Sequence, residues 1–304
     1  MFLAQGGAVL FQWTNDHWEL VGIESDTSTN SSRNSYRSLF VRVAAYNPWI
    51  ESIAHPDNSI SVALETITSF NPFAPYECDK KAPCGCSYED VLFRPTRLIG
   101  GQDAIEGSWS MIVSLRFYES DEHFCAGTLL SKSFVLTAAH CVDHFLSATT
   151  INITVYAGVT RQSDSTGYER RVTEIHIHPN YTRRPLFLNN LALLQLDRPL
   201  VSINNPVLSK TCVHRMNPSI SMNEQYPKND TPLVIVGWGA MRPGSFQSSD
   251  YLRQKQVNPI ENRDPICQNA SSSPELQFCA GLYDVVQGKW NTFLLFIRSH
   301  VSSI

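Results

Sequence analysis

The stretch that decides the fold is Val135-Leu136-Thr137-Ala138-Ala139-His140-Cys141, a short apolar run that ends in a histidine and a cysteine. It overlaps one of several apolar, β-branched runs that turn residues separate: Met111–Phe117, Gly127–Ala138, Ile151–Val159, Leu191–Leu196 and Leu233–Gly237. Short strands that recur with turn residues between them indicate an all-β barrel or sandwich, and argue against βαβ units.

Composition and charge exclude two classes of partner. The 304 residues, 42% of them hydrophobic, are enough to bury one or two cores. The formal net charge is −4 and no cluster of Lys or Arg stands out, so we expect no nucleic-acid partner. The longest apolar run near the end, Phe293–Ile297, is far too short to span a bilayer, and we expect no membrane segment.

The cysteines and sequons point to an oxidising compartment. An even number of cysteines, eight, fits a disulfide framework, whereas reduced core thiols or a zinc site are the alternatives. Cys84-Gly85-Cys86 is too tight for the usual zinc pairs, and no Cys-x-x-Cys occurs. Five Asn-x-Ser/Thr sequons agree with secretion: Asn30, Asn152, Asn180, Asn229 and Asn269. Met1–Phe11 lacks the basic residues of a secretory signal, so we expect either a true start upstream or a different start codon.

The opening stretch resembles the catalytic-histidine motif of the trypsin-like serine proteases. A lone buried histidine would more simply be structural, but all seven residues of the motif match. The resemblance implies that His140 is the general base and that Cys125, sixteen residues earlier, pairs with Cys141 to pin its loop. It also implies an activation bond between Arg97 and Leu98, because Arg97-Leu98-Ile99-Gly100-Gly101 resembles a zymogen cleavage site.

Further matches extend this resemblance from Leu98 to about Asp284. They are Ile177-His178-Pro179-Asn180-Tyr181, Gly237-Trp238-Gly239 and Phe278-Cys279-Ala280-Gly281. The resemblance implies a disulfide between Cys267 and Cys279. It also implies that Cys212 holds a propeptide cysteine: Cys86 is the expected partner and Cys84 the alternative, and Cys78 pairs with the remaining one.

Two departures put catalysis in doubt. The segment Asn189-Asn190-Leu191-Ala192-Leu193-Leu194 has Asn190 where the family has the aspartate that orients the histidine. An amide cannot stabilise an imidazolium by charge and favours the wrong tautomer, which costs about four orders of magnitude in rate in the trypsin-type example. The Gly-Asp-Ser-Gly-Gly of the nucleophile is absent after Gly281, where the sequence diverges beyond Asp284.

The first 53 residues resemble the C-terminal part of the same family's domain. Three pieces match in order: Gly6–Phe11, Trp18–Ile23 and Phe40–Ile50, with a Ser/Thr/Asn-rich loop predicted over Ser25–Ser35. On this match Gln5 occupies the nucleophile position and Ala4 that of the activation aspartate, whereas an unrelated half-buried meander is the alternative for any single piece.

These matches predict an all-β fold with two antiparallel six-stranded barrels. The second barrel is incomplete within residues 98–304, residues 6–53 are the segment able to complete it, and a short helix is expected near 44–53. We predict four segments: 1–53 as the tail of a trypsin-like domain, 54–97 as a linker or propeptide with Cys78, Cys84 and Cys86, 98–284 as a truncated protease domain, and 285–304 as an unrelated tail. The linker can extend to about 150 Å, so reach does not prevent closure.

Three functions remain open at this point. The chain is a member of a trypsin-like endopeptidase family that is expected to be inactive as written. Its own role is then either that of a secreted pseudoprotease that binds partners, or that of a fragment of a tandem-domain active protease. The parent would act on protein or peptide substrates. No metal or organic cofactor is expected, and the sequence leaves the oligomeric state open.

Overall fold

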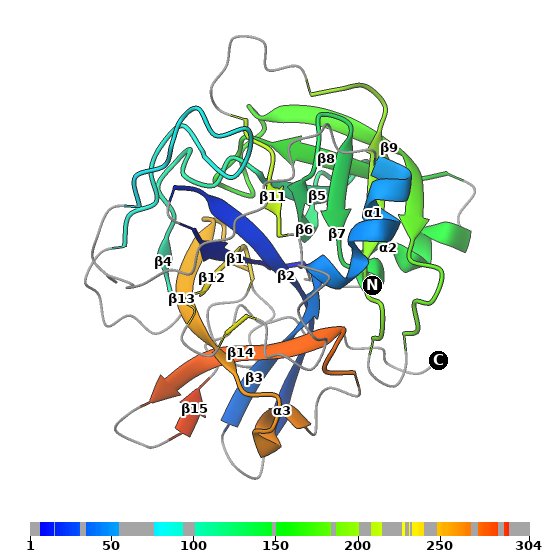
Figure 1. The fold of residues 1–304 in the computed structure, drawn as a ribbon. Coiled ribbons are helices and arrows are strands. Elements are labelled where there is room, and N and C mark those ends of the chain that lie inside the picture. Colours follow the sequence, from blue (N-terminus) through cyan, green and yellow to red (C-terminus); the bar gives the residue numbers. More distant parts are fainter. Residues whose placement is uncertain are drawn as a thin grey trace.

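The computed structural model describes residues 7–14, 16–30, 35–54, 76–93, 101–147, 150–183, 187–200, 208–214, 227–228, 231, 233–239, 248–268, 273–284 and 289–291. Two β-barrels make up most of this part of the chain, together with a few short helices (Figure 1). This confirms the predicted all-β, two-barrel fold. In the described part of the chain no helix has the length and apolarity needed to cross a membrane.

The first barrel is closed and is built from consecutive parts of the chain. Its strands are β5 (Ile112–Phe117), β6 (His123–Leu129), β7 (Phe134–Thr137), β8 (Ile153–Ala157), β9 (Tyr168–Ile177) and β10 (Ala192–Leu196), in the order β10-β7-β6-β5-β8-β9. Side chains such as Val113, Leu115 and Leu193 are fully buried, because each strand turns apolar residues toward the interior.

The second barrel joins the two ends of the described chain. It comprises β1 (Val9–Trp13), β2 (Trp18–Asn30), β3 (Ser35–Arg42), β12 (Leu233–Gly237), β13 (Arg253–Ile260) and β14 (Gln277–Asp284). The strand order β14-β3-β2-β1-β12-β13 closes on itself through the pairing of β13 with β14. The two-residue strands β4 (Gln102–Asp103) and β11 (Cys212–Val213) pair with β13 and β2, and β15 (Lys289–Asn291) pairs with β14.

The N-terminal strands therefore complete the second barrel, as the sequence predicted. Figure 1 shows the blue strands β1 to β3 beside the orange strands β13 and β14. Val9 pairs with Val236 of β12, and Phe40 of β3 pairs with Phe278 of β14, their rings stacked with centroids 5.8 Å apart. Without β1 to β3, the edges of β12 and β14 would have unpaired backbone groups and the core would be open to water.

The hairpin between β2 and β3 corrects one prediction. A loop was expected over Ser25–Ser35, but β2 continues to Asn30 and β3 starts at Ser35, where these two residues pair. Serine and threonine fit a strand once a partner strand accepts its hydrogen bonds, so composition alone misplaced the turn.

The helices are short and lie at strand ends. They are the 3-10 helices η1 (Val43–Tyr46) and η2 (Asp143–Ser147), and the α-helices α1 (Asn47–Ala54), α2 (Ala139–Val142) and α3 (Pro265–Gln268). The helix expected near 44–53 is confirmed as η1 followed by α1. It docks on the first barrel: the rings of Tyr46 and Trp49 contact His178, and the Tyr46 hydroxyl donates to Asn189 Oδ1 at 3.0 Å.

An aromatic cluster packs where the two barrels meet. The Trp109 ring lies 5.2 Å from that of Phe11 and 4.9 Å from that of Trp18, and its indole N–H donates to Gln254 Oε1 at 2.7 Å. Tyr76, which precedes the first barrel in sequence, packs on Trp18 with centroids 4.9 Å apart. Aromatic groups from three distant parts of the chain thus hold the barrels together.

Candidate functional site

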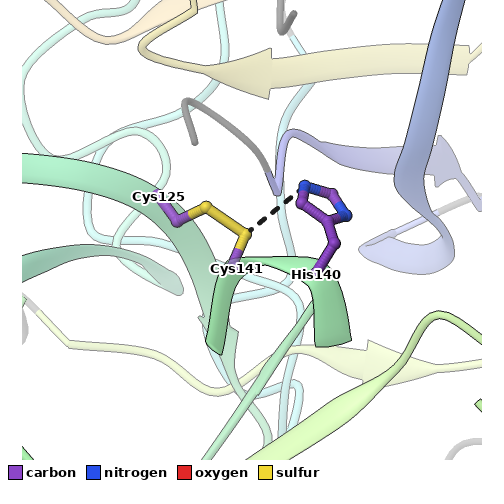
Figure 2. Close-up of side chains that lie close together, drawn as sticks. All are labelled: Cys125, His140 and Cys141. Carbon is purple, nitrogen blue, oxygen red and sulfur yellow. Dashed lines mark hydrogen bonds between the residues drawn. A yellow bond between two sulfur atoms is a disulfide. The ribbon is translucent and has the colours of Figure 1, made fainter. Parts of the chain in front are cut away.

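His140 lies in α2, directly after β7 of the first barrel. The next residue, Cys141, forms a disulfide with Cys125 of β6, which fixes the short helix to the barrel (Figure 2). The histidine is only 5% exposed, and its Nε2 lies 3.7 Å from Cys141 Sγ.

Asn190 contacts His140 through both ends of its amide. Asn189 has a φ of 51°, a left-handed conformation that asparagine tolerates, and this turn precedes the buried Asn190. The backbone N–H of His140 donates to Asn190 Oδ1 at 2.9 Å, and Asn190 Nδ2 lies 2.8 Å from His140 Nδ1. The asparagine is therefore hydrogen-bonded to both the backbone and the ring of His140.

Ser25 of β2 completes this polar group. Its hydroxyl lies 3.0 Å from Asn190 Nδ2 and donates to the backbone carbonyl of Phe187 at 3.3 Å. The ring of Phe187 lies over the imidazole of His140, with centroids 5.6 Å apart. The serine thus comes from the N-terminal segment, while the histidine and the asparagine come from the first barrel.

These bonds fix the tautomer of His140. A backbone N–H can only donate, so the atom that faces it must be the amide oxygen of Asn190. The amide nitrogen then donates one proton to Ser25 Oγ and the other to Nδ1 of His140. Since Nδ1 accepts, the ring proton of the neutral imidazole resides on Nε2, beside the sulfur of Cys141.

The imidazole is also held neutral. Burial lowers the pKa of His140 to about 4; the hydrogen bond with Asn190 opposes this shift, and the guanidinium of Arg183 adds to it. A neutral imidazole with its proton on Nε2 can donate a hydrogen bond from that atom, but it cannot accept a proton there.

Cys125, His140 and Cys141 form the only group of three metal-binding residue types whose ligand atoms lie within 4.8 Å of one another in the described ranges. Both sulfurs are joined in the disulfide shown in Figure 2, so neither is a thiolate that could bind a metal. In this oxidised state the cluster is not a metal site.

Known proteins resemble this chain in sequence. The family model described as Trypsin matches residues 98–289. The chain belongs to the trypsin family. Its relatives include chymotrypsin-C of Mus musculus, 29% identical over 168 residues, an alignment that covers 52% of this chain and 56% of that protein.

A second relative is chymotrypsin-like elastase family member 1 of Canis lupus familiaris. It is 27% identical over 190 residues, which cover 62% of this chain and 68% of the relative. Among solved structures, human heparin binding protein superposes with a TM-score of 0.48 at 21% identity, over 62% of this chain and 73% of that one. The chain thus spans little more than half of one trypsin-family relative and about two thirds of the other.

The structure also places the remaining predicted residues of this trypsin-family chain. The predicted disulfide framework is confirmed, and the four bonds are Cys78–Cys86, Cys84–Cys212, Cys125–Cys141 and Cys267–Cys279. The expected partner of Cys212, Cys86, was wrong: Cys212 pairs with the alternative, Cys84, and Cys86 pairs with Cys78. Gln5, at the nucleophile position, and Arg97 and Leu98, at the activation bond, lie outside the described residues.

Sequence reasoning missed Ser25 and Phe187. Ser25 comes two residues after the matched run Trp18–Ile23, so the end of that strand was the available clue. Phe187 lies in a segment that matched no motif, and its position over His140 depends on a fold that brings β2 to this loop.

Proposed function

We propose that this chain is a trypsin-family protein that does not hydrolyse peptide bonds and that functions by binding protein or peptide partners. One observation carries the proposal: the amide of Asn190 donates to Nδ1 of His140, which leaves the proton on Nε2. In a serine protease the orienting carboxylate accepts from Nδ1–H, so that Nε2 is free to take the proton of the serine. Here the roles of the two ring nitrogens are reversed.

The sequence supports the same conclusion independently. No Gly-Asp-Ser-Gly-Gly occurs in it, and glutamine, which is not a nucleophile, precedes Gly6-Gly7. The glycines of that motif normally expose the serine and help to build the oxyanion hole. With neither a nucleophile nor a general base, the remaining features are those of a scaffold.

Compartment and partners follow from the disulfides and the family. All eight cysteines are paired, which supports an extracellular location, and the five sequons make it a candidate glycoprotein. Relatives of the chymotrypsin and elastase type support protein or peptide ligands. The Arg97–Leu98 bond remains the proposed activation cleavage.

A fluorophosphonate serine probe tests the proposal. The chain, glycosylated, oxidised and cleaved after Arg97, is expected to give no covalent labelling and no hydrolysis of peptide substrates. His140→Ala serves as the matched control, because background turnover from a contaminant is insensitive to it. Stoichiometric labelling that His140→Ala abolishes would overturn the proposal.

The order of the segments also fits a second candidate, a portion of a tandem-domain protease. The strands that close the second barrel precede the first barrel in sequence, as they would if they ended one domain and the next domain followed. Sequencing of the transcript through the codons after Asp284 separates the two candidates. A Gly-Asp-Ser-Gly-Gly segment there supports the tandem protease. Codons for Val285 to Ile304 in its place support the pseudoprotease.

A further inference from the structure

A cavity of about 580 Å³ lies between the segment around Cys84 and the first barrel. Lys80, Ala82, Pro83 and residues 86–88 form one wall, and the end of β6 with the residues that follow it forms another. Leu200 and residues 208–210 complete the lining. None of these residues belongs to the group around His140, so the cavity is a separate feature of the molecule.

The charge of the lining is of one sign. Lys80, Lys132 and Lys210 line the cavity, and no Asp or Glu does, although acidic residues outnumber basic ones, 28 to 24, in the chain as a whole. Lys80 is held in place because its ammonium donates to the Ser87 carbonyl at 3.0 Å and to Asp90 at 2.6 Å. Because Asp90 offsets the charge of Lys80, an anion in the cavity would be attracted chiefly by Lys132 and Lys210.

Part of the cavity lining is apolar. Leu208 is partly buried, whereas Leu129 and Leu200 are each only 3% exposed and so present few atoms to the cavity. Three serines, Ser87, Ser131 and Ser209, also line it. Tyr88 also lines the cavity and is 56% exposed, so an aromatic face is open to solvent there. Apolar walls with a few charged groups are typical of sites for small organic molecules, and the volume lies within their usual range.

Covalent and backbone bonds hold the walls in position. The Cys84–Cys212 disulfide joins the two sides, and the Gly85 N–H donates to the Lys210 carbonyl at 2.8 Å. The Leu200 N–H donates to the Lys132 carbonyl at 2.7 Å. Gly85 has a φ of +76°, and a Cβ there would collide with the Trp18 carbonyl, so only glycine permits this close approach. The cavity is thus formed before any ligand arrives, which lowers the entropic cost of binding.

We propose that this cavity binds an organic anion with an apolar body, of the class of a medium-chain carboxylate. The apolar body would lie against Leu208 and Tyr88, beside the few exposed atoms of Leu129 and Leu200, and the carboxylate would lie between Lys132 and Lys210. An inorganic anion would use only the lysines, and a neutral lipid only the leucines. The proposed ligand is therefore the one that uses the lysines and the apolar side chains together.

Calorimetric titration with decanoate, decanol and inorganic sulfate tests the assignment on the oxidised chain. Decanoate is expected to bind with a stoichiometry of one, and decanol and sulfate to bind at least roughly tenfold more weakly. Decanoate affinity should also fall as ionic strength rises, since partly exposed charges are screened. Chemical-shift changes confined to residues 80–88, 129–132 and 208–210 would place decanoate in this cavity.

Substitutions in the cavity test separately how the carboxylate and the apolar body of the ligand are bound. Lys132→Gln with Lys210→Gln is expected to weaken decanoate by roughly tenfold and leave decanol unchanged. Leu208→Asn should weaken both. Lys81→Gln, which removes one positive charge next to the lining but outside it, is the control for charge and should change neither. Equal binding of decanol and decanoate, no decanoate binding, or binding only of an acidic peptide would each overturn the proposal.

Discussion

Asn190→Asp is the substitution that tests most directly how the hydrogen bonds of Asn190 determine the tautomer of His140. In the native chain Asn190 Nδ2 lies 2.8 Å from His140 Nδ1 and 3.0 Å from the hydroxyl of Ser25. A carboxylate has no proton to donate, so His140 must move its own proton to Nδ1, and Ser25 must turn its hydroxyl toward the new oxygen. The backbone N–H of His140, 2.9 Å from Asn190 Oδ1, keeps its acceptor.

The magnitude follows from the distance and the burial. Burial lowers the pKa of His140 to about 4, and Asn190 has no charge to offset it. A carboxylate at hydrogen-bond distance in a buried site raises the proton affinity of an imidazole by roughly ten- to thousandfold, or about 1.4–4 kcal/mol. The pKa of His140 should therefore rise toward the ordinary value of histidine.

Nitrogen-15 NMR of the histidine ring reports both which ring nitrogen carries the proton and the pKa of His140. The native chain is expected to show the proton on Nε2 and a low pKa, and Asn190→Asp is expected to show the proton on Nδ1 and a higher pKa. Asn189→Asp is the control, because it adds the same charge one residue away, where the side chain contacts Tyr46 and Asn180 instead. A native spectrum with the proton on Nδ1 would refute the assignment of the amide, and with it the main support for the proposed function.

Two further predictions concern stability. Glu19 is fully buried in β2, and although burial alone would raise its pKa, hydrogen bonds from His17, His214 and Gln12 lower it to about 2. Because the folded pKa lies below the unfolded one, this stabilisation, about 3 kcal/mol, is present above pH 4.5 and is lost as the pH falls through about 2. In urea unfolding at a series of pH values, Glu19→Gln should therefore be less stable than the native chain at pH 7, and the gap should close in acid; a gap that stays constant with pH contradicts this. Replacing Cys84 and Cys212, 128 residues apart, by serine should cost about 5 kcal/mol in the same assay, against about 2.5 kcal/mol for Cys78 and Cys86, which are 8 apart; equal losses would contradict the loop-length reasoning.

The barrels could be predicted from sequence because their evidence is local. Most strands of the first barrel are short apolar runs between turn residues, whereas the mostly polar β9 has no such signal, and the seven residues that end in His140-Cys141 carry the resemblance to the family. The matched pieces near the N-terminus also predicted the closure of the second barrel, because three of them occur in the order of the missing strands. Asn190 was found in the same way, by its place directly before Leu191-Ala192-Leu193-Leu194.

What could not be predicted depends on contacts between distant segments. Cys84 and Cys86 are two residues apart, so either could pair with Cys212 on sequence grounds. The choice depends on the left-handed turn at Gly85, which packs against the Trp18 backbone. The tautomer of His140 depends on a backbone N–H and on Ser25, which is 165 residues from Asn190.

The packing of β1 to β3 against the rest of the chain both closes the second barrel and helps to fix the tautomer of His140. β1 to β3 complete the barrel, and the same β2 carries Ser25 to the amide of Asn190, where its oxygen accepts the second amide proton. The Ser25 hydroxyl is in turn directed to Phe187, whose ring covers His140. The N-terminal segment therefore supplies core packing and also one of the hydrogen bonds, from Asn190 Nδ2 to Ser25 Oγ, that hold the amide in the orientation unsuited to proton abstraction; two others are to His140 of the first barrel. A single substitution at Asn190 would have to reorganise Ser25 as well, which is why the structure holds this tautomer more firmly than an isolated asparagine–histidine pair would.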